Sequence, residues 1–183
     1  MQSRSDESSR RVVGNGRPSN PPRLKIDTVN ERYSCEHCRG VFMIVWRESA
    51  TAADFLEIDR FVGDLSRAHP SGIGVLVILE PGNTRPPAAP ARQALAQMTA
   101  KYKASIHGIA TVLLGGTIKH SMIRFVLSTL QLMSPSEVAQ ETFDSIGSAT
   151  TWLQTRVHGV ASLDLTGNAQ HLRDAGVIAR KTG

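Results

Sequence analysis

The chain has 183 residues, 40% of them hydrophobic, with 21 Lys and Arg against 16 Asp and Glu. This length suits one domain with tails, and a core of about 130 residues can bury a proper hydrophobic interior. No apolar run approaches the ~18 residues that cross a bilayer, and two cysteines do not suggest a secreted disulfide scaffold. Since the polar N-terminus also lacks the apolar stretch of a signal peptide, we expect a cytoplasmic protein without a membrane span.

Residues 1–24 are predicted to form a disordered basic tail, because Ser, Arg, Gly, Asn and Pro dominate them. Five arginines against Asp6 and Glu7 give this segment a surplus of three positive charges, out of a net five for the chain. The high pI therefore reflects the tail in large part. Nucleic-acid binding is not expected except through this tail.

Three short apolar runs dominate the rest of the chain: Val41–Trp46, Ile73–Leu79 and Ile106–Leu114. Each is rich in Val, Ile and Leu, is short enough for a buried strand and is followed by a segment with helical spacing of apolar residues. Parallel strands need a helical crossover between them. The order therefore predicts an α/β domain with a largely parallel sheet, over about residues 25–158.

The domain is predicted to open with an antiparallel hairpin. Order should begin near Leu24–Val29, and Arg32–Cys38 then leads through Arg39 and Gly40 into the run that starts at Val41. Glycine adopts the positive φ that a tight turn needs, which favours a hairpin at this point.

A helix is predicted from an N-cap at Thr51 to about Ala68, before Pro70. Apolar residues three and four apart form its buried stripe; they are Phe55, Ile58, Val62 and Leu65. The acidic residues of the same helix are interpreted as a solvated face beside two arginines; they are Asp54, Glu57, Asp59 and Asp64.

The remaining elements follow from prolines, glycines and apolar spacing. Prolines make 81–90 a loop, and a helix should follow from Pro90 to about Tyr102. The later elements are a helix over Ile118–Met133, an edge strand over Val138–Phe143, a core helix from Ile146 to Val157, and a C-terminal extension (159–183) with a short helix near Leu163–Leu172.

This order of elements resembles that of a STAS domain, the fold of sulphate transporters and anti-sigma-factor antagonists, and more closely the stand-alone SpoIIAA-like proteins common in bacteria. The segments that carry the resemblance are VFMIVWRESAT, GVLVILEPG, GIATVLLGGTIKHSMIRFVL and ETFDSIGSATTWL, within about residues 31–155. The resemblance implies a mixed sheet that opens with an antiparallel hairpin. It also implies a regulatory module that works through protein contacts.

The chain departs from this family at the switch site. Classical antagonists carry a phosphorylatable serine in an Asp-Ser-Ser-Gly type motif after the central strand, where this chain has a loop rich in proline. Thr84 is the only hydroxyl nearby, and it lies inside that loop. A phosphorylation switch is therefore not expected.

Cys35 and Cys38 are separated by two residues, a spacing that can hold one Zn²⁺ or support dithiol exchange. Zinc needs two further ligands, and the remaining histidines are scattered along the chain. A thioredoxin-like motif would follow a strand at the start of a helix, whereas this pair precedes a turn. We interpret the cysteines as incidental hairpin residues, with a metal shared between subunits or redox chemistry as the alternatives.

The Gly115-Gly116-Thr117 turn, followed by Lys119, lies between a predicted strand and a predicted helix. Backbone amides at a helix N-terminus attract anions, so this turn is a weak candidate for binding phosphate or carboxylate. It is not a Walker loop, which ends in Gly-Lys-Ser/Thr. An ordinary tight turn is the competing interpretation.

The sequence thus favours a non-enzymatic regulatory protein, acting on a protein partner or as a homodimer, with no catalytic residues or cofactor. The alternatives are a protein that binds a small ligand (lipid or anion) and a metal or thiol protein. The carboxyl ends of parallel strands gather ligands and partners. The predicted surface at that edge comprises Asn83, Thr84, Arg85, Thr117 and Lys119.

Overall fold

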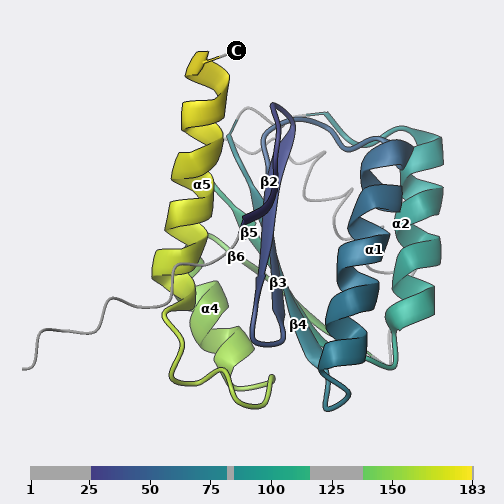
Figure 1. Cartoon of the computed structure of the whole chain (residues 1–183), viewed down its shortest axis with the longest axis vertical. Coiled ribbons are helices and arrows are strands. Elements are labelled where there is room, and N and C mark those ends of the chain that lie inside the picture. Colours follow the sequence, from purple (N-terminus) through teal and green to yellow (C-terminus); the bar gives the residue numbers. More distant parts are fainter. Residues whose placement is uncertain (1–25, 82–84, 116–137, 183) are drawn as a thin grey trace, which may run out of the picture.

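The structure is a computed structural model, and it describes residues 26–81, 85–115 and 138–182. The predicted tail (1–24) and the predicted helix over Ile118–Met133 therefore lie outside the described residues. Figure 1 shows a central sheet with helices on both of its faces. The predicted α/β architecture is confirmed.

Six strands form one sheet in sequential order, β1-β2-β3-β4-β5-β6. Their bounds are Ile26–Val29 (β1), Tyr33–Cys38 (β2), Val41–Trp46 (β3), Ile73–Leu79 (β4), Ile106–Leu113 (β5) and Ala139–Phe143 (β6). β1, β2 and β3 pair antiparallel, and β3 to β6 pair parallel. The predicted mixed sheet and the edge position of β6 are both correct.

The opening hairpin has the predicted tight turn, which consists of two residues. Cys38 pairs with Val41, and the two residues between them have positive φ: 40° at Arg39 and 85° at Gly40. Positive φ at both central positions is the signature of a type I′ turn, whose twist matches that of the strands it joins.

α1 (Ala52–Ala68) begins at the predicted cap. Thr51 Oγ1 accepts a hydrogen bond from the amide of Asp54 at 3.3 Å, and Asp54 Oδ2 accepts one from the Thr51 amide at 2.8 Å. This reciprocal capping box satisfies two amides that the helix leaves unpaired. α2 (Ala89–Tyr102) begins one residue before Pro90 and lies beside α1.

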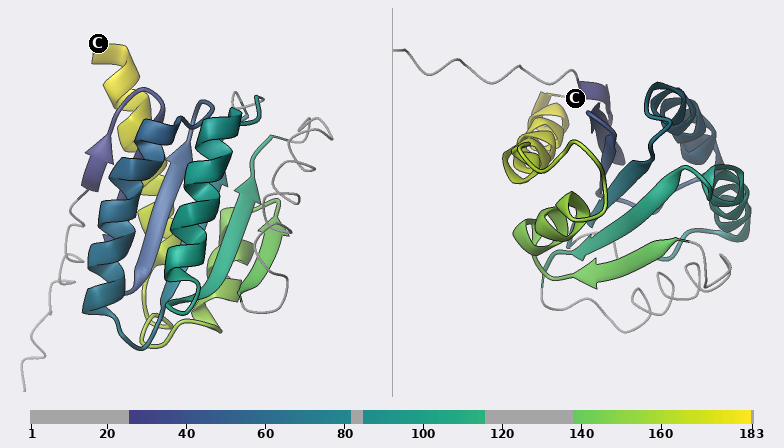
Figure 2. Two further views of the ribbon diagram at one scale, coloured as in Figure 1. Left: turned by 90° about the vertical axis from the view of Figure 1, so that its right-hand side faces the viewer. Right: turned by 90° about the horizontal axis from the view of Figure 1, so that it is seen from below.

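The helices divide between the two faces of the sheet because the strands follow one another in order. Crossovers of one hand place α1 and α2 on the same face, so the opposite face has to be covered by later segments. α4 (Ile146–Gln154) and α5 (Leu165–Thr182) lie there, as both views in Figure 2 show.

Each face buries its own core. The core under α1 and α2 includes Phe42, Ile44 and Trp46 from β3, whereas Val41, Met43 and Val45 of the same strand belong to the core under α4 and α5. Alternate residues of a strand point to opposite faces, so a strand buried on both sides reads as one continuous apolar run.

The C-terminal segment differs from the predicted short helix. α5 has 18 residues and packs against β1, β2 and β3, with Leu165, Ala169 and Leu172 fully buried. Beyond Leu172 the side of α5 that packs on the sheet continues to Gly176. A Cβ placed on Gly176 would lie 2.1 Å from the Arg47 side chain. A glycine contributes no apolar side chain to the spacing pattern, so the sequence signal stops before the helix does.

Candidate functional site

The loops that follow β4 and β5 lie against each other at the carboxyl-end edge of the sheet. Gly115 has a φ of 86°, and a Cβ placed on it would lie 2.9 Å from Pro81 Cβ. The amide of Leu114 donates to the carbonyl of Leu79 at 3.1 Å, which extends the pairing of the strands up to this contact. The parallel order predicted this meeting of the two loops.

Only one of the five residues predicted for this surface is among the described ones. Arg85 is exposed in the segment that leads from the loop into α2. Asn83, Thr84, Thr117 and Lys119 lie outside the described residues.

α5 also reaches this edge, which the sequence did not indicate. Arg173 Nε donates to Glu80 Oε1 at 2.7 Å, and Arg173 Nη2 lies 3.3 Å from Glu80 Oε2. Glu80 directly follows β4, and both side chains are largely buried. This forked ion pair fixes α5 beside the loops, because a guanidinium matches a carboxylate with two parallel hydrogen bonds. The partners are 93 positions apart, so no local pattern could have paired them.

Two apolar side chains lie exposed on the same part of α5. Val177 is 44% exposed and Ile178 is 63% exposed. Figure 1 shows this end of the helix extending past the sheet. We use the name carboxyl-end surface for Pro81, Arg85, Gly115, Val177 and Ile178 together.

A second polar cluster lies where the start of α1 meets β1 and β2. Arg32 donates to both carboxylate oxygens of Asp54, at 2.7 and 3.2 Å, and Asp54 is only 3% exposed. Burial opposes its ionisation, but hydrogen bonds from Arg32 and Thr51 outweigh that effect and hold the pKa of Asp54 below its usual value. Glu57 accepts hydrogen bonds from Thr28 and from Tyr33, the latter at 2.6 Å. The prediction that these carboxylates form a solvated face is therefore wrong for Asp54, which holds α1 to the hairpin.

The two cysteines lie on opposite faces of β2. Cys35 is in the core under α1 and α2, and Cys38 packs against the other core. Residues three apart on a strand point to opposite sides, so the two sulfurs cannot share one ion or one disulfide in this strand. Burial raises the pKa of Cys35 to about 12 and also raises that of Cys38. No group of three or more His, Cys, Asp or Glu side chains suited to a metal occurs among the described residues.

Glu36, between these cysteines, is a feature that sequence reasoning missed. Its side chain is fully buried under the face that α5 covers, and neither carboxylate oxygen has a hydrogen-bond partner among the described residues. Burial, with a smaller effect from the charge of Asp27, raises the pKa of Glu36 to about 7. The only sequence signal is an acidic residue at a position whose neighbours in register are apolar, such as Met43.

No protein-family model matches the chain, and no curated protein matches it. A solved structure similar to it is that of an uncharacterized protein of the DUF3478 family with a SpoIIAA-like fold, from Shewanella loihica PV-4. The sequences are 14% identical, the TM-score is 0.46, and the match covers 75% of this chain and 99% of that chain. This likeness concerns the fold alone, and nothing about activity follows from it.

Among residues 26–81, 85–115 and 138–182, no helix is both long and apolar enough to cross a membrane.

Proposed function

We propose that this protein is a non-enzymatic regulatory module of the cytoplasm that binds another protein through its carboxyl-end surface. The observation that carries the proposal is that three features lie at the same end of the sheet: the proline loop against Gly115, the exposed Arg85, and the exposed apolar end of α5. An apolar patch beside a charged rim is the usual composition of a protein contact.

The edge is already organised before a partner arrives. Pro86 and Pro87 follow Arg85 directly, and Arg92 of α2 donates to the carbonyl of Pro87 at 3.0 Å. Prolines and this hydrogen bond restrict the backbone near Arg85, so less conformational entropy is lost on binding. The ion pair between Arg173 and Glu80 holds α5 at the end of β4 and so restricts its movement at this edge.

The test compares proteins captured from the source cell by the wild type and by two double variants. Arg85→Ala with Val177→Ser changes the carboxyl-end surface. Arg60→Ala with Leu56→Ser is the matched control, because Arg60 is also exposed and Leu56 is a 69% exposed apolar residue on α1. Melting curves first establish that both variants are folded.

We expect the surface variant to bind the partner about tenfold or more weakly than the wild type and the control do, because it lacks two interface side chains. Equal recovery by all three proteins would reject the carboxyl-end surface as the binding site. A homodimer through the same surface would instead show a mass that depends on concentration and falls to that of a monomer in the surface variant.

A further inference from the structure

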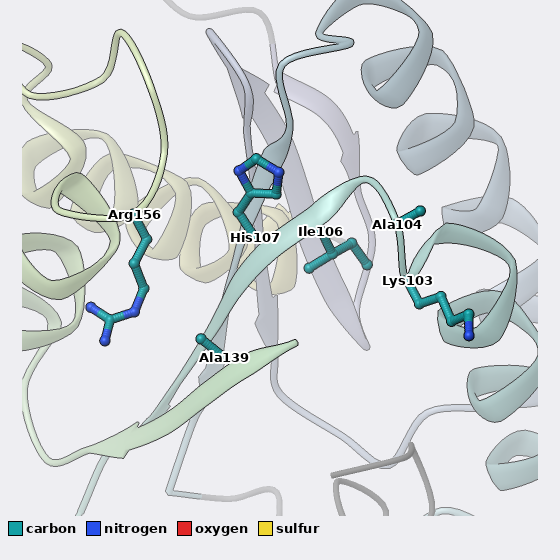
Figure 3. Close-up of a pocket in the computed structure, with 6 residues that line it drawn as sticks. All are labelled: Lys103, Ala104, Ile106, His107, Ala139 and Arg156. Carbon is teal, nitrogen blue, oxygen red and sulfur yellow. The ribbon is translucent and has the colours of Figure 1, made fainter. Parts of the chain in front are cut away.

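The basic side chains around the pocket where β5 and β6 begin do not converge. Arg156 follows α4 on one face of the sheet, Lys103 follows α2 on the other, and His107 lies between them on β5. Figure 3 shows the three side chains pointing away from one another. A binding site needs polar groups aimed at one point, so these cations do not form one anion site.

Glu36, by contrast, lies inside the contact between the opening hairpin and α5. It pairs in register with Met43 of β3, so its side chain points to the same face of the sheet as Met43, which is the face that α4 and α5 cover. Two positions earlier on β2, Ser34 Oγ donates to the carbonyl of Leu172 at 3.0 Å. Since α5 packs on β2 and Glu36 is fully buried, its carboxyl group lies beneath this helix.

The strands around Glu36 offer its negative charge no compensation. Asp27 of β1 is a nearby acidic group, and its carboxylate lies 2.6 Å from His37 Nδ1. Cys38 lies on the same face of β2 as Glu36, and burial raises the pKa of its thiol. Neither carboxylate oxygen of Glu36 has a hydrogen-bond partner among the described residues. Ionisation of Glu36 would therefore bury an unpaired negative charge near Asp27, which is costly.

α5 covers Glu36 with an apolar surface. Its described residues that are buried against the sheet are apolar or glycine; they are Leu165, Ala169, Leu172 and Gly176. The titratable side chains His171 and Asp174 are exposed, and Arg173 is paired with Glu80. The helix thus favours a neutral group beneath it.

Arg47, which follows β3, is a buried cation under the same helix. Its guanidinium donates to Ser34 Oγ at 3.0 Å and to the carbonyl of Asn30 at 3.1 Å. A Cβ on Gly176 would lie 2.1 Å from it, so this cation lies against the later turns of α5. It makes no hydrogen bond to Glu36, whose two oxygens have no partner among the described residues. Neutralisation of Glu36 is therefore left to a proton.

The docking of α5 is for this reason linked to pH. Burial, with a smaller effect from Asp27, raises the pKa of Glu36 to about 7, and undocking of α5 would return the carboxyl group to water. A group whose pKa is raised by burial stabilises the buried state at low pH, and this contribution is lost as pH rises to the raised pKa. α5 is not part of the strand pairing, so it can leave the sheet without breaking any of the β ladders.

We propose that protonation of Glu36 holds α5 on the sheet, and that loss of this proton lets α5 open as one unit while the sheet, α1 and α2 stay folded. The opened state uncovers the part of the core that contains Val41, Met43 and Val45 of β3. The inference needs no binding partner, so it goes beyond the proposed function and does not rest on it.

Hydrogen exchange of individual amides, followed by NMR on the full chain between pH 5 and pH 7.5, tests the proposal. Division by the intrinsic exchange rate at each pH gives protection factors. We expect those of Ala169 to Ile178 in α5 to fall about fiftyfold over this range, because the pKa of Glu36 is about 7 when α5 is docked and about 4.5 when it is open. Amides of β4 should stay better protected than those of α5 at every pH, since their exchange needs the whole domain to unfold.

Glu36→Gln should remove this pH dependence and leave α5 equally protected at pH 5 and pH 7.5. Glu141→Gln is the matched control, because Glu141 is an exposed acidic residue on β6, and it should keep the fiftyfold change of the wild type. If Glu36→Gln does not fold, Glu36→Met serves the same comparison, since it also lacks a titratable group. Protection of α5 that does not change with pH in the wild type, or that equals the protection of β4 at every pH, would overturn the inference.

Discussion

At the scale of single residues, Glu36 should make stability depend on pH near neutrality. Its pKa in the folded protein is raised to about 7, so the folded state binds a proton that the unfolded state has already lost. The contribution of Glu36 to stability therefore falls by about 3 kcal/mol as pH rises from about 4.5 to about 7, and it is level above that range.

The variant Glu36→Gln should not show this pH dependence. We expect its free energy of unfolding, relative to the wild type, to increase by about 3 kcal/mol between pH 4.5 and pH 7.5. Urea melts at several pH values measure the difference. Parallel curves for the two proteins would mean that Glu36 is ionised or solvated in the folded state.

The thiols give a second prediction at this scale. The raised pKa values of Cys35 and Cys38 leave little thiolate at neutral pH, and the thiolate is the reactive form. A thiol reagent at pH 7.5 should therefore modify Cys35 only after denaturation, with Cys38 the faster of the two in the folded protein. Rapid modification of native Cys35, or a Cys35–Cys38 disulfide in the folded protein, would contradict the geometry of β2.

Sequence reasoning was least successful for buried polar residues. Asp54 and Glu36 both look like ordinary acidic residues in the sequence, but one is held by Arg32 and the other has no partner among the described residues. Their surroundings come from strands and helices far away in the chain. Only the three-dimensional arrangement decides whether a carboxylate is solvated, paired or kept protonated.

At the scale of elements, the β2–β3 turn depends on its glycine. Gly40→Ala should lower stability by about 1 kcal/mol or more, since φ is 85° and a Cβ would also meet His69 at 3.4 Å. Gly147→Ala is the matched control. It lies within α4 with nothing within 4 Å of the new Cβ, so it should raise stability by about 0.5–1 kcal/mol. Denaturant melts measure the change in the free energy of unfolding. A change of the same sign in both variants would exclude a backbone effect at Gly40.

α5 provides the second prediction for an element. Leu172→Ala should cost about 2–5 kcal/mol, because it leaves a cavity between this helix and the sheet. Val177→Ala, on the exposed side of the same helix, should cost less than about 0.5 kcal/mol. Similar small losses for both variants would show that α5 contributes little to the folded domain.

The contrast between β4 and α5 shows what the pattern of residues can predict. β4 is an unbroken apolar run, so its bounds, Ile73–Leu79, were predicted to the residue. α5 mixes small, polar and charged residues around Leu165, Ala169 and Leu172, and its C-terminal half is fixed by Arg173 and Gly176. Contacts made by a guanidinium or by a bare Cα leave no apolar periodicity to detect.

At the scale of the whole molecule, sequential strand order sets the arrangement of the layers. Crossovers of one hand put α1 and α2 on one face, which leaves the opposite face of β1 to β3 for α5.

The packing of α5 on the opening hairpin has a consequence for synthesis. Val41, Met43 and Val45 leave the ribosome early, whereas Leu165, Ala169 and Leu172, which cover them, leave it late. A nascent chain that has emerged only as far as α4 leaves these apolar residues of β3 without the cover of α5. Exposed apolar surface favours association with other chains during that interval, and translation pauses before residue 165 would prolong the exposure.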